Sequence, residues 1–254
     1  MVLDFDFHIH TFHSPCGHSE MLPLDIVRVA AERGMQTIAF TDHWYPSSDI
    51  AIIDGTRAAV SDAQRQLGTS LKVFYGCEAE IMSPGATSAS AELAKRLDFV
   101  MVAATYFCNK PMTVLPDGDD DFHARYFLRM FEFGVSLPWV SVMAHPFNNM
   151  HGFCSNNIFK IITDSDLIPG IEAAAENAVA MEISRRMFAS QEQYRFLINF
   201  YGLCRKSGVK FTLGSDAHRL KDVAQIHLLQ PVIEELGLAE EDFWRPSSPL
   251  TANS

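Results

Sequence analysis

Histidines and acidic residues recur in this chain just where short apolar runs end. Between Asp4 and His10, polar and apolar residues alternate, so His8 and His10 project from the same face of a strand, roughly 6.5 to 7 Å apart. Two imidazoles in this arrangement can share one metal ion. An isolated pair is equally consistent with a half-exposed edge strand, so the spacing alone does not decide between them.

Four further apolar runs carry the same residue types. They contain or end in Thr41-Asp42-His43, Gly76-Cys77-Glu78, Ala144-His145-Pro146 and Ser215-Asp216-Ala217-His218. Imidazoles and carboxylates gathered in one place would repel or stay unsatisfied without a cation, whereas divalent ions complete both their charge and their coordination. If the fold brings these runs together, the sequence predicts a metal centre.

The elements that would position these residues follow a regular alternation. Strands are expected at 4–10, 37–43, 71–81, 99–105, 139–145, 178–184 and 209–216, and helices at 23–33, 54–67, 89–96, 123–133, 166–176 and 191–206. This rhythm predicts parallel βα units, and seven of them in 254 residues suit a closed or nearly closed barrel. The carboxyl ends of barrel strands converge on one rim, so the polar strand ends are expected to meet there.

Composition limits the partners of this protein. We expect one domain over residues 1–245 and a loosely packed tail over 246–254. A net charge of −11 argues against nucleic acid as a partner, although local arginines or metal can still recruit a small anion. The absence of a long apolar stretch predicts a cytoplasmic protein that does not enter membranes. Five scattered cysteines without a Cys-x-x-Cys pair argue against a disulfide framework.

Taken in order, the motifs resemble those of the polymerase and histidinol phosphatase (PHP) superfamily. The matching segments are His8-Ile9-His10-Thr11, Thr41-Asp42-His43, Gly76-Cys77-Glu78, His145-Pro146 and Gly214-Ser215-Asp216-Ala217-His218. The resemblance implies a distorted (β/α)7 TIM-like barrel that holds two or three divalent ions, Zn, Mn or Fe, and hydrolyses phosphoesters.

The same resemblance implies a set of metal ligands. His8, His10, Glu78 and Asp216 would hold one ion, and Glu78 would bridge to a second ion that His145 also binds. A third ion would take His43, His218 and one ligand from the loop over residues 11–20. That loop ligand is His18, Cys16 or Glu20, and we favour His18, since a Ser-Pro-Cys-Gly turn explains Cys16 equally well.

One position departs from the family pattern. The strand at 99–105 resembles a segment that ordinarily ends in a metal-binding histidine, and Thr105 stands in its place. His123, at the head of the next helix, is a candidate to fill the vacancy or to contact the substrate. Otherwise a water fills it, or the centre holds fewer ions.

A centre of this kind supports hydrolysis without a nucleophilic side chain. Several cations together bind phosphate oxygens, lower the pKa of a water and stabilise the leaving oxygen. Asp216, His218 and Glu78 are the expected catalytic residues. Three arginines near the expected rim suit bidentate contacts to a phosphorylated substrate: Arg185, Arg186 and Arg219.

The sequence thus predicts a phosphomonoesterase for a small substrate such as histidinol phosphate or a nucleotide monophosphate. One alternative, suggested by Thr105, is a degenerate PHP module with weak or no catalysis. A PHP-type nuclease is a second alternative, and a metal-dependent amidohydrolase is a third.

Overall fold

The protein is a parallel barrel of seven strands. The computed structural model describes residues 3–104 and 113–247. Pairing follows the order β1 (Phe5–Ile9), β2 (Thr37–Phe40), β4 (Lys72–Ser83), β6 (Phe99–Ala103), β7 (Val142–Ala144), β8 (Ala180–Ser184) and β9 (Phe211–Gly214). Two short strands also pair with β4, namely β3 (His43–Trp44) in parallel and β5 (Ala86–Thr87) antiparallel. The expected barrel of seven βα strands is confirmed.

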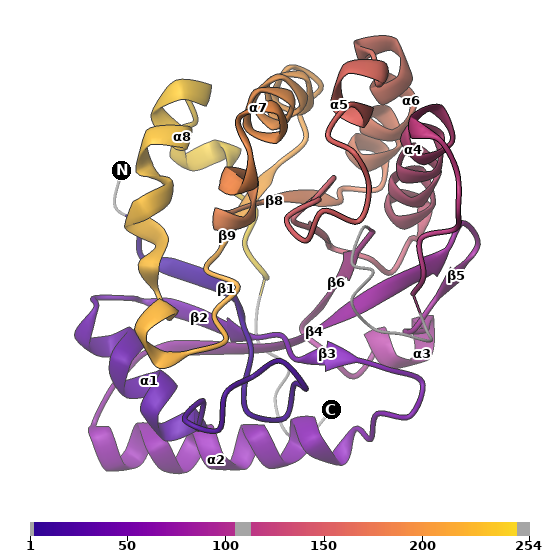
Figure 1. The fold of residues 1–254 in the computed structure, drawn as a ribbon. Coiled ribbons are helices and arrows are strands. Elements are labelled where there is room, and N and C mark those ends of the chain that lie inside the picture. The colour runs from indigo at the N-terminus through magenta and orange to yellow at the C-terminus, as the bar shows by residue number, and fades with distance from the viewer. Residues whose placement is uncertain (1–2, 105–112, 248–254) are drawn as a thin grey trace.

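Helices surround this ring of strands on the outside (Figure 1). The α-helices are α1 (Pro23–Glu32), α2 (Ala51–Leu67), α3 (Ala91–Ala94), α4 (Asp120–Ser136), α5 (Ile158–Ile161), α6 (Asp164–Glu176), α7 (Gln191–Lys206) and α8 (Gln230–Leu236). Within the described residues, there are also four short 3-10 helices: η1 (Arg185–Ala189), η2 (Leu220–Asp222), η3 (Gln225–Leu229) and η4 (Glu240–Asp242). Helix α4 begins three residues before the expected start, because the Asp119 side chain caps it by accepting the Phe122 N–H.

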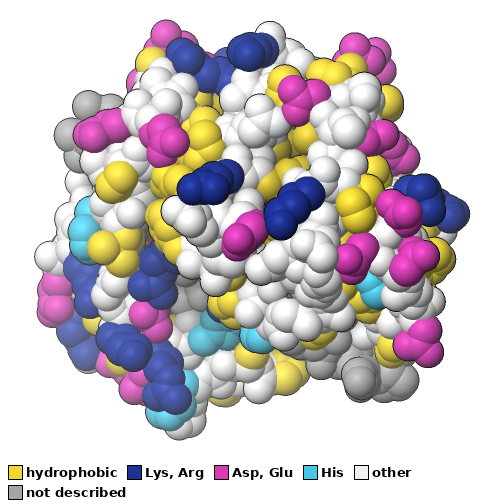
Figure 2. Space-filling model, turned by 45° about the horizontal axis from the view of Figure 1, so that its top comes forward, with side chains coloured by type: hydrophobic (Ala, Val, Ile, Leu, Met, Phe, Trp, Pro, Cys, Tyr) yellow, Lys and Arg dark blue, Asp and Glu magenta, His cyan; other side chains and the backbone are white. Residues whose placement is uncertain are grey.

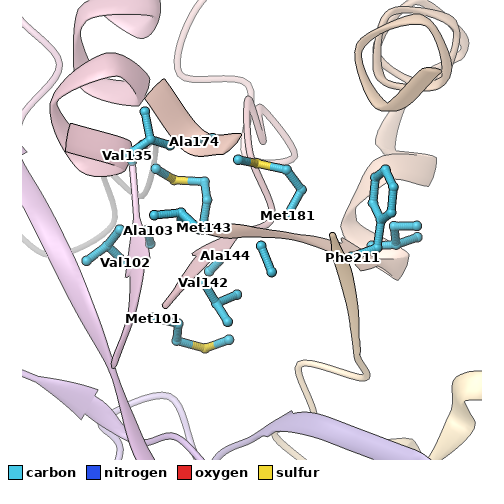
Figure 3. Packing of buried hydrophobic residues seen from close by; sticks show 14 of the residues in the cluster. Met101, Val102, Ala103, Val135, Val142, Met143, Ala144, Ala174, Met181 and Phe211 are labelled. Atoms are coloured by element: carbon cyan, nitrogen blue, oxygen red, sulfur yellow. The ribbon is translucent and has the colours of Figure 1, made fainter. Parts of the chain in front are cut away.

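Both faces of the barrel strands are buried, which explains their apolar composition. Figure 3 shows Met143 on the side of Val135 and Ala174, which belong to the outer helices, and Val142 on the opposite side with Met101. All five residues are fully buried. The alternation along each strand therefore fills the barrel interior with one set of side chains and packs the other set against the helices.

The barrel closes between β1 and β9 through a short seam. Ile9 and Ala217 form a single parallel bridge, and the His10 N–H donates to the Ala217 carbonyl oxygen at 3.1 Å. Further along the seam, the carboxylate of Asp6 accepts the main-chain N–H groups of Ser215 and Ala224, each at 2.9 Å. Burial raises the pKa of Asp6 to about 6, against the effect of these hydrogen bonds. The buried Asp6 side chain thus supplies hydrogen bonds that main-chain pairing between β1 and β9 does not make.

The expected strand at 37–43 is divided in two. β2 ends at Phe40, and Asp42 lies between it and β3. The Asp42 carboxylate accepts hydrogen bonds from the Thr11 N–H and the Ser14 hydroxyl, both at 2.7 Å. Asp42 therefore links the loop after β1 to the break after β2.

Some of the predicted features lie outside the described residues, and others can be compared with the structure. Thr105 and most of the 246–254 tail lie outside the described residues. The cysteines within them, at positions 16, 77, 154 and 204, form no disulfide. In the same residues, no helix combines the length and apolar character needed to cross a membrane.

Candidate metal centre

Four predicted ligands meet in the barrel: His8 and His10 at the end of β1, Glu78 within β4, and Asp216 just after β9. The Nε2 atoms of His8 and His10 lie 3.1 Å apart. Glu78 Oε2 lies 3.4 and 3.5 Å from these two atoms, and Asp216 Oδ1 lies 3.7 and 3.2 Å from them. A tetrahedral zinc ion with ligands at about 2.0 to 2.1 Å separates its ligand atoms by about 3.3 to 3.4 Å. The ligand atoms of His8, His10 and Glu78 therefore have the spacing of ligands to one ion, and Asp216 Oδ1 lies close to both histidines.

Hydrogen bonds to the outer ring nitrogens fix both imidazoles. His8 Nδ1 lies 2.7 Å from Glu182 Oε1, a carboxylate that can only accept. His10 Nδ1 lies 3.0 Å from the Ser14 hydroxyl, which gives its only hydrogen to Asp42 and so accepts from His10. Both Nδ1 atoms thus carry the proton, and both Nε2 lone pairs point into the centre, as metal ligands require.

Glu78 contacts two further histidines. His145 Nε2 lies 2.9 Å from Glu78 Oε1, and His43 Nδ1 lies 3.0 Å from Oε2. With a different histidine at each oxygen, the carboxylate has the placement of a bridge between two ions. His145 and Asp216 both have positive φ values, 26° and 50°. Such a conformation is strained outside glycine and is found preferentially at functional sites.

The electrostatics of the cluster suit cation binding. Burial disfavours the charged form of Glu78, but His43 and His8 outweigh it and hold the pKa of its carboxyl well below the usual value. Burial also disfavours the charged form of Asp216, but His8 and Arg186 outweigh it and hold the pKa of its carboxyl well below the usual value. Burial lowers the pKa of His10 and of His43 to about 4, whereas the neighbouring carboxylates outweigh burial and raise the pKa of His8 and of His145. A bound cation would take the place of the extra protons on His8 and His145. Ionised carboxylates and neutral imidazoles are the forms that bind metal.

A second group of ligand atoms lies beside the first. Single ligand atoms of His10, Cys16, His43 and His218 lie within 4.8 Å of one another. The favoured loop ligand, His18, is not among them, because its main-chain N–H binds the His218 carbonyl oxygen at 3.0 Å and its side chain is exposed. Its Nδ1 lies 3.7 Å from Oε2 of Glu20, the third loop candidate. The structure therefore brings Cys16, and not His18, to the histidines.

The cluster opens into a pocket of about 660 Å³. All three predicted arginines, Arg185, Arg186 and Arg219, line it. Arg186 Nε donates to Asp216 Oδ2, and Arg185 Nη2 lies 3.0 Å from Asp222 Oδ1. Figure 2 shows histidine side chains in a hollow of the surface, with a group of Lys and Arg side chains on its left.

The predicted residue His123 does not join this pocket. It lies in the first turn of α4, and its Nε2 is 3.0 Å from the Pro116 carbonyl oxygen. The hydrogen bond turns the ring toward the segment before the helix. The structure therefore supports neither a ligand role nor a substrate contact for this side chain.

Sequence reasoning missed the buried carboxylate Glu182. It holds His8 Nδ1 with one oxygen and accepts the His145 main-chain N–H with the other, at 2.7 Å. A side chain at Gly214 would not fit beside it, since an added Cβ would lie 1.9 Å from Glu182 Oε1. The available signal was an acidic residue in the middle of the apolar strand Ala180–Ser184.

Comparison with known proteins agrees with this architecture. A model described as the PHP domain matches residues 6–151, more than half of the chain. The chain belongs to the PHP domain family. A protein named "probable phosphatase" from Caldicellulosiruptor saccharolyticus is 28% identical to it, covering 95% of this chain and 91% of that protein. One of the same name from Acetivibrio thermocellus is 24% identical, covering 92% and 87%.

Among solved structures, this PHP domain protein resembles a histidinol phosphate phosphatase from Lactococcus lactis. That enzyme was solved with zinc, L-histidinol and phosphate. The TM-score is 0.67 at 18% identity, covering 93% of this chain and 94% of that one. At this identity the match confirms the fold.

Proposed function

We propose that this PHP domain protein hydrolyses a small phosphomonoester at a centre of two or three divalent ions, Zn, Mn or Fe. The observation that carries the proposal is the cluster of His8, His10, Glu78 and Asp216 ligand atoms beneath a pocket lined by three arginines. The similarity to proteins named phosphatases over nearly their whole length also supports it.

The residues divide into groups around Glu78. His8, His10, Glu78 and Asp216 would hold one ion, Glu78 and His145 a second, and His43 and His218 a third. Bound ions of this kind would polarise the phosphoryl group and lower the pKa of a water. The chain supplies the spacing of the ligands, the fixed imidazole tautomers and the carboxylates that balance the added charge.

Around the ions, we assign the protein's own groups to proton transfer. The pKa of Asp216 lies well below its usual value, so its carboxylate is ionised near neutral pH and can accept a proton. The His218 ring is oriented by the Asp216 carbonyl oxygen, 2.9 Å from Nδ1. It lines the pocket, and because this carbonyl holds Nδ1–H, its Nε2 is left as a ligand for the third ion.

Arg186 is the arginine best placed to bind the phosphoryl group. It donates to Asp216, and its Nη2 lies 3.4 Å from His218 Nδ1, so it adjoins the ligand cluster directly. A guanidinium retains further N–H groups for phosphate oxygens after one contact is made. Arg185 and Arg219 line the same pocket and are proposed to bind the rest of an anionic substrate.

The test is a hydrolysis assay on protein stripped with a chelator and reconstituted with zinc or manganese. The substrate panel contains L-histidinol phosphate, nucleoside 5′-monophosphates, a phosphodiester and single-stranded DNA. We expect monoester turnover only after metal is restored, and a loss of kcat/KM in Arg186→Lys. The control is Arg195→Lys, which alters an exposed arginine of α7 outside the pocket and should keep kcat/KM unchanged. Full turnover by metal-free protein would refute the proposal, as would two bound ions with no monoester turnover. Cleavage of the diester or DNA alone would favour a nuclease.

A further inference from the structure

We propose that Cys16 is a thiolate ligand, which joins the imidazoles of His43 and His218 and makes the outer metal position selective for zinc. This inference rests on the metal centre of the proposed function. It concerns the one ligand that the sequence left open, and it assigns a metal preference to that position.

The ligands of the outer metal position are found by asking which of the four clustered residues already belongs to the inner ion. His10 belongs to the inner ion, because its Nδ1 binds Ser14 and its Nε2 lies 3.2 Å from Asp216 Oδ1 and 3.1 Å from His8 Nε2. Removing it from the group of His10, Cys16, His43 and His218 leaves one thiol and two imidazoles. Three protein ligands with a fourth position left for water or substrate are typical of catalytic zinc.

The loop after β1 holds Cys16 between two anchors. On one side, the Ser14 hydroxyl donates to Asp42 and accepts the His43 main-chain N–H at 3.1 Å. On the other side, the main chain at His18 binds the His218 carbonyl oxygen. The first anchor thus ties the loop to Asp42 and to the main chain of His43. The second ties it to the main chain of His218. Cys16 is placed beside both histidines by contacts that do not involve its own side chain.

Gly17 allows the chain to turn sharply after the cysteine. Its N–H donates to the Ser14 carbonyl oxygen at 2.8 Å, and a Cβ at this position would lie 2.0 Å from the Thr11 carbonyl oxygen. Any other residue would push the turn outward. The close approach of the main chain here lies directly after Cys16, whose ligand atom is within 4.8 Å of those of His43 and His218.

The chemistry of the donor sets the metal preference. On binding, the sulfur–hydrogen bond breaks, the proton passes to solvent and a sulfur lone pair forms the bond to the ion, with no change in oxidation state. A thiolate is a soft ligand that suits zinc, whereas manganese and magnesium prefer oxygen. A carboxylate in place of Cys16 would instead favour the ions that prefer oxygen.

Cobalt substitution tests this assignment directly, because a thiolate bound to Co²⁺ produces a sulfur-to-metal charge-transfer absorption in the near ultraviolet. The Co²⁺-loaded wild-type protein is compared with Cys16→Ser, with His18→Ala and with the control Cys154→Ser, whose cysteine lies outside the cluster. We expect the band in the wild type and in both His18→Ala and Cys154→Ser, and its loss in Cys16→Ser. A band that survives in Cys16→Ser, or no band in the wild type, would overturn the proposal.

Metal counting supplies a second measurement. We expect Cys16→Ser to lose one zinc per chain, and Cys16→Asp to shift the preference of that position from zinc toward manganese at least tenfold. Should the variants fail to fold, alkylation of the wild-type protein with peptide mapping still decides, since zinc must protect Cys16. Equal labelling with and without zinc would refute the assignment. None of these measurements requires catalytic activity. If they support the Cys16 ligand but the protein hydrolyses no phosphoester, the proposed function is refuted and the ligand assignment stands.

Discussion

Replacing Glu182 with glutamine tests whether the buried carboxylate positions the inner ligands. The new amide would keep one acceptor oxygen, while its NH₂ group would face either His8 Nδ1–H or the His145 main-chain N–H. One buried donor then loses its partner, which destabilises the metal-free protein by about 1 to 3 kcal/mol. The zinc affinity of the inner position should fall about 10- to 100-fold, as is typical when a partner of a ligating histidine is removed.

The affinity change corresponds to about 1.4 to 2.8 kcal/mol and is measured by competition with a chromophoric chelator. Urea unfolding of the metal-free protein gives the stability change. The control is Glu92→Gln, which alters an exposed glutamate of α3 whose side chain is 81% exposed. A zinc affinity within twofold of the wild-type value in Glu182→Gln would show that the carboxylate does not position His8.

Three further expectations concern the seam, the barrel interior and the metal. Asp6 has a folded pKa of about 6 against 3.8 ordinarily, so its contribution to stability should fall by about 2 to 3 kcal/mol as pH rises from about 4 to about 7. Urea unfolding of metal-free wild type and Asp6→Asn checks this, and a constant difference between them contradicts it. Gly214→Ala should displace Glu182 and His8 and lower zinc affinity at least tenfold in the same chelator assay; unchanged affinity would show that the interior adapts. Zinc at about 100 times its Kd should stabilise the protein by about 2.7 kcal/mol and raise Tm by roughly 5 to 10 °C in calorimetry, and an unchanged Tm would argue against binding to the folded state.

Local patterns were sufficient to predict the barrel and most of the cluster. Strand alternation places His8 and His10 on one face, and the parallel topology brings Glu78, His145 and Asp216 to the same rim. These inferences need only the period of a strand and the geometry of βα units.

The remaining features depend on contacts between distant segments. The choice of Cys16 over His18 follows from bonds of the loop to Asp42 and to the His218 carbonyl oxygen, which no local pattern reveals. Glu182 was visible as a charge in an apolar strand, but its partners lie on β1 and after β7. The break between β2 and β3 likewise reflects side-chain bonds made by Asp42.

The short seam between β1 and β9 has a consequence for biosynthesis. β1 is synthesised before β9, so His8 and His10 leave the ribosome before Asp216 has been made. Asp216 and the main-chain partners of Asp6 follow about 200 residues later, and until they are made the nascent chain lacks both Asp216 and the closing edge of the barrel. β1 and β9 must therefore both be made before His8, His10, Glu78 and Asp216 can meet.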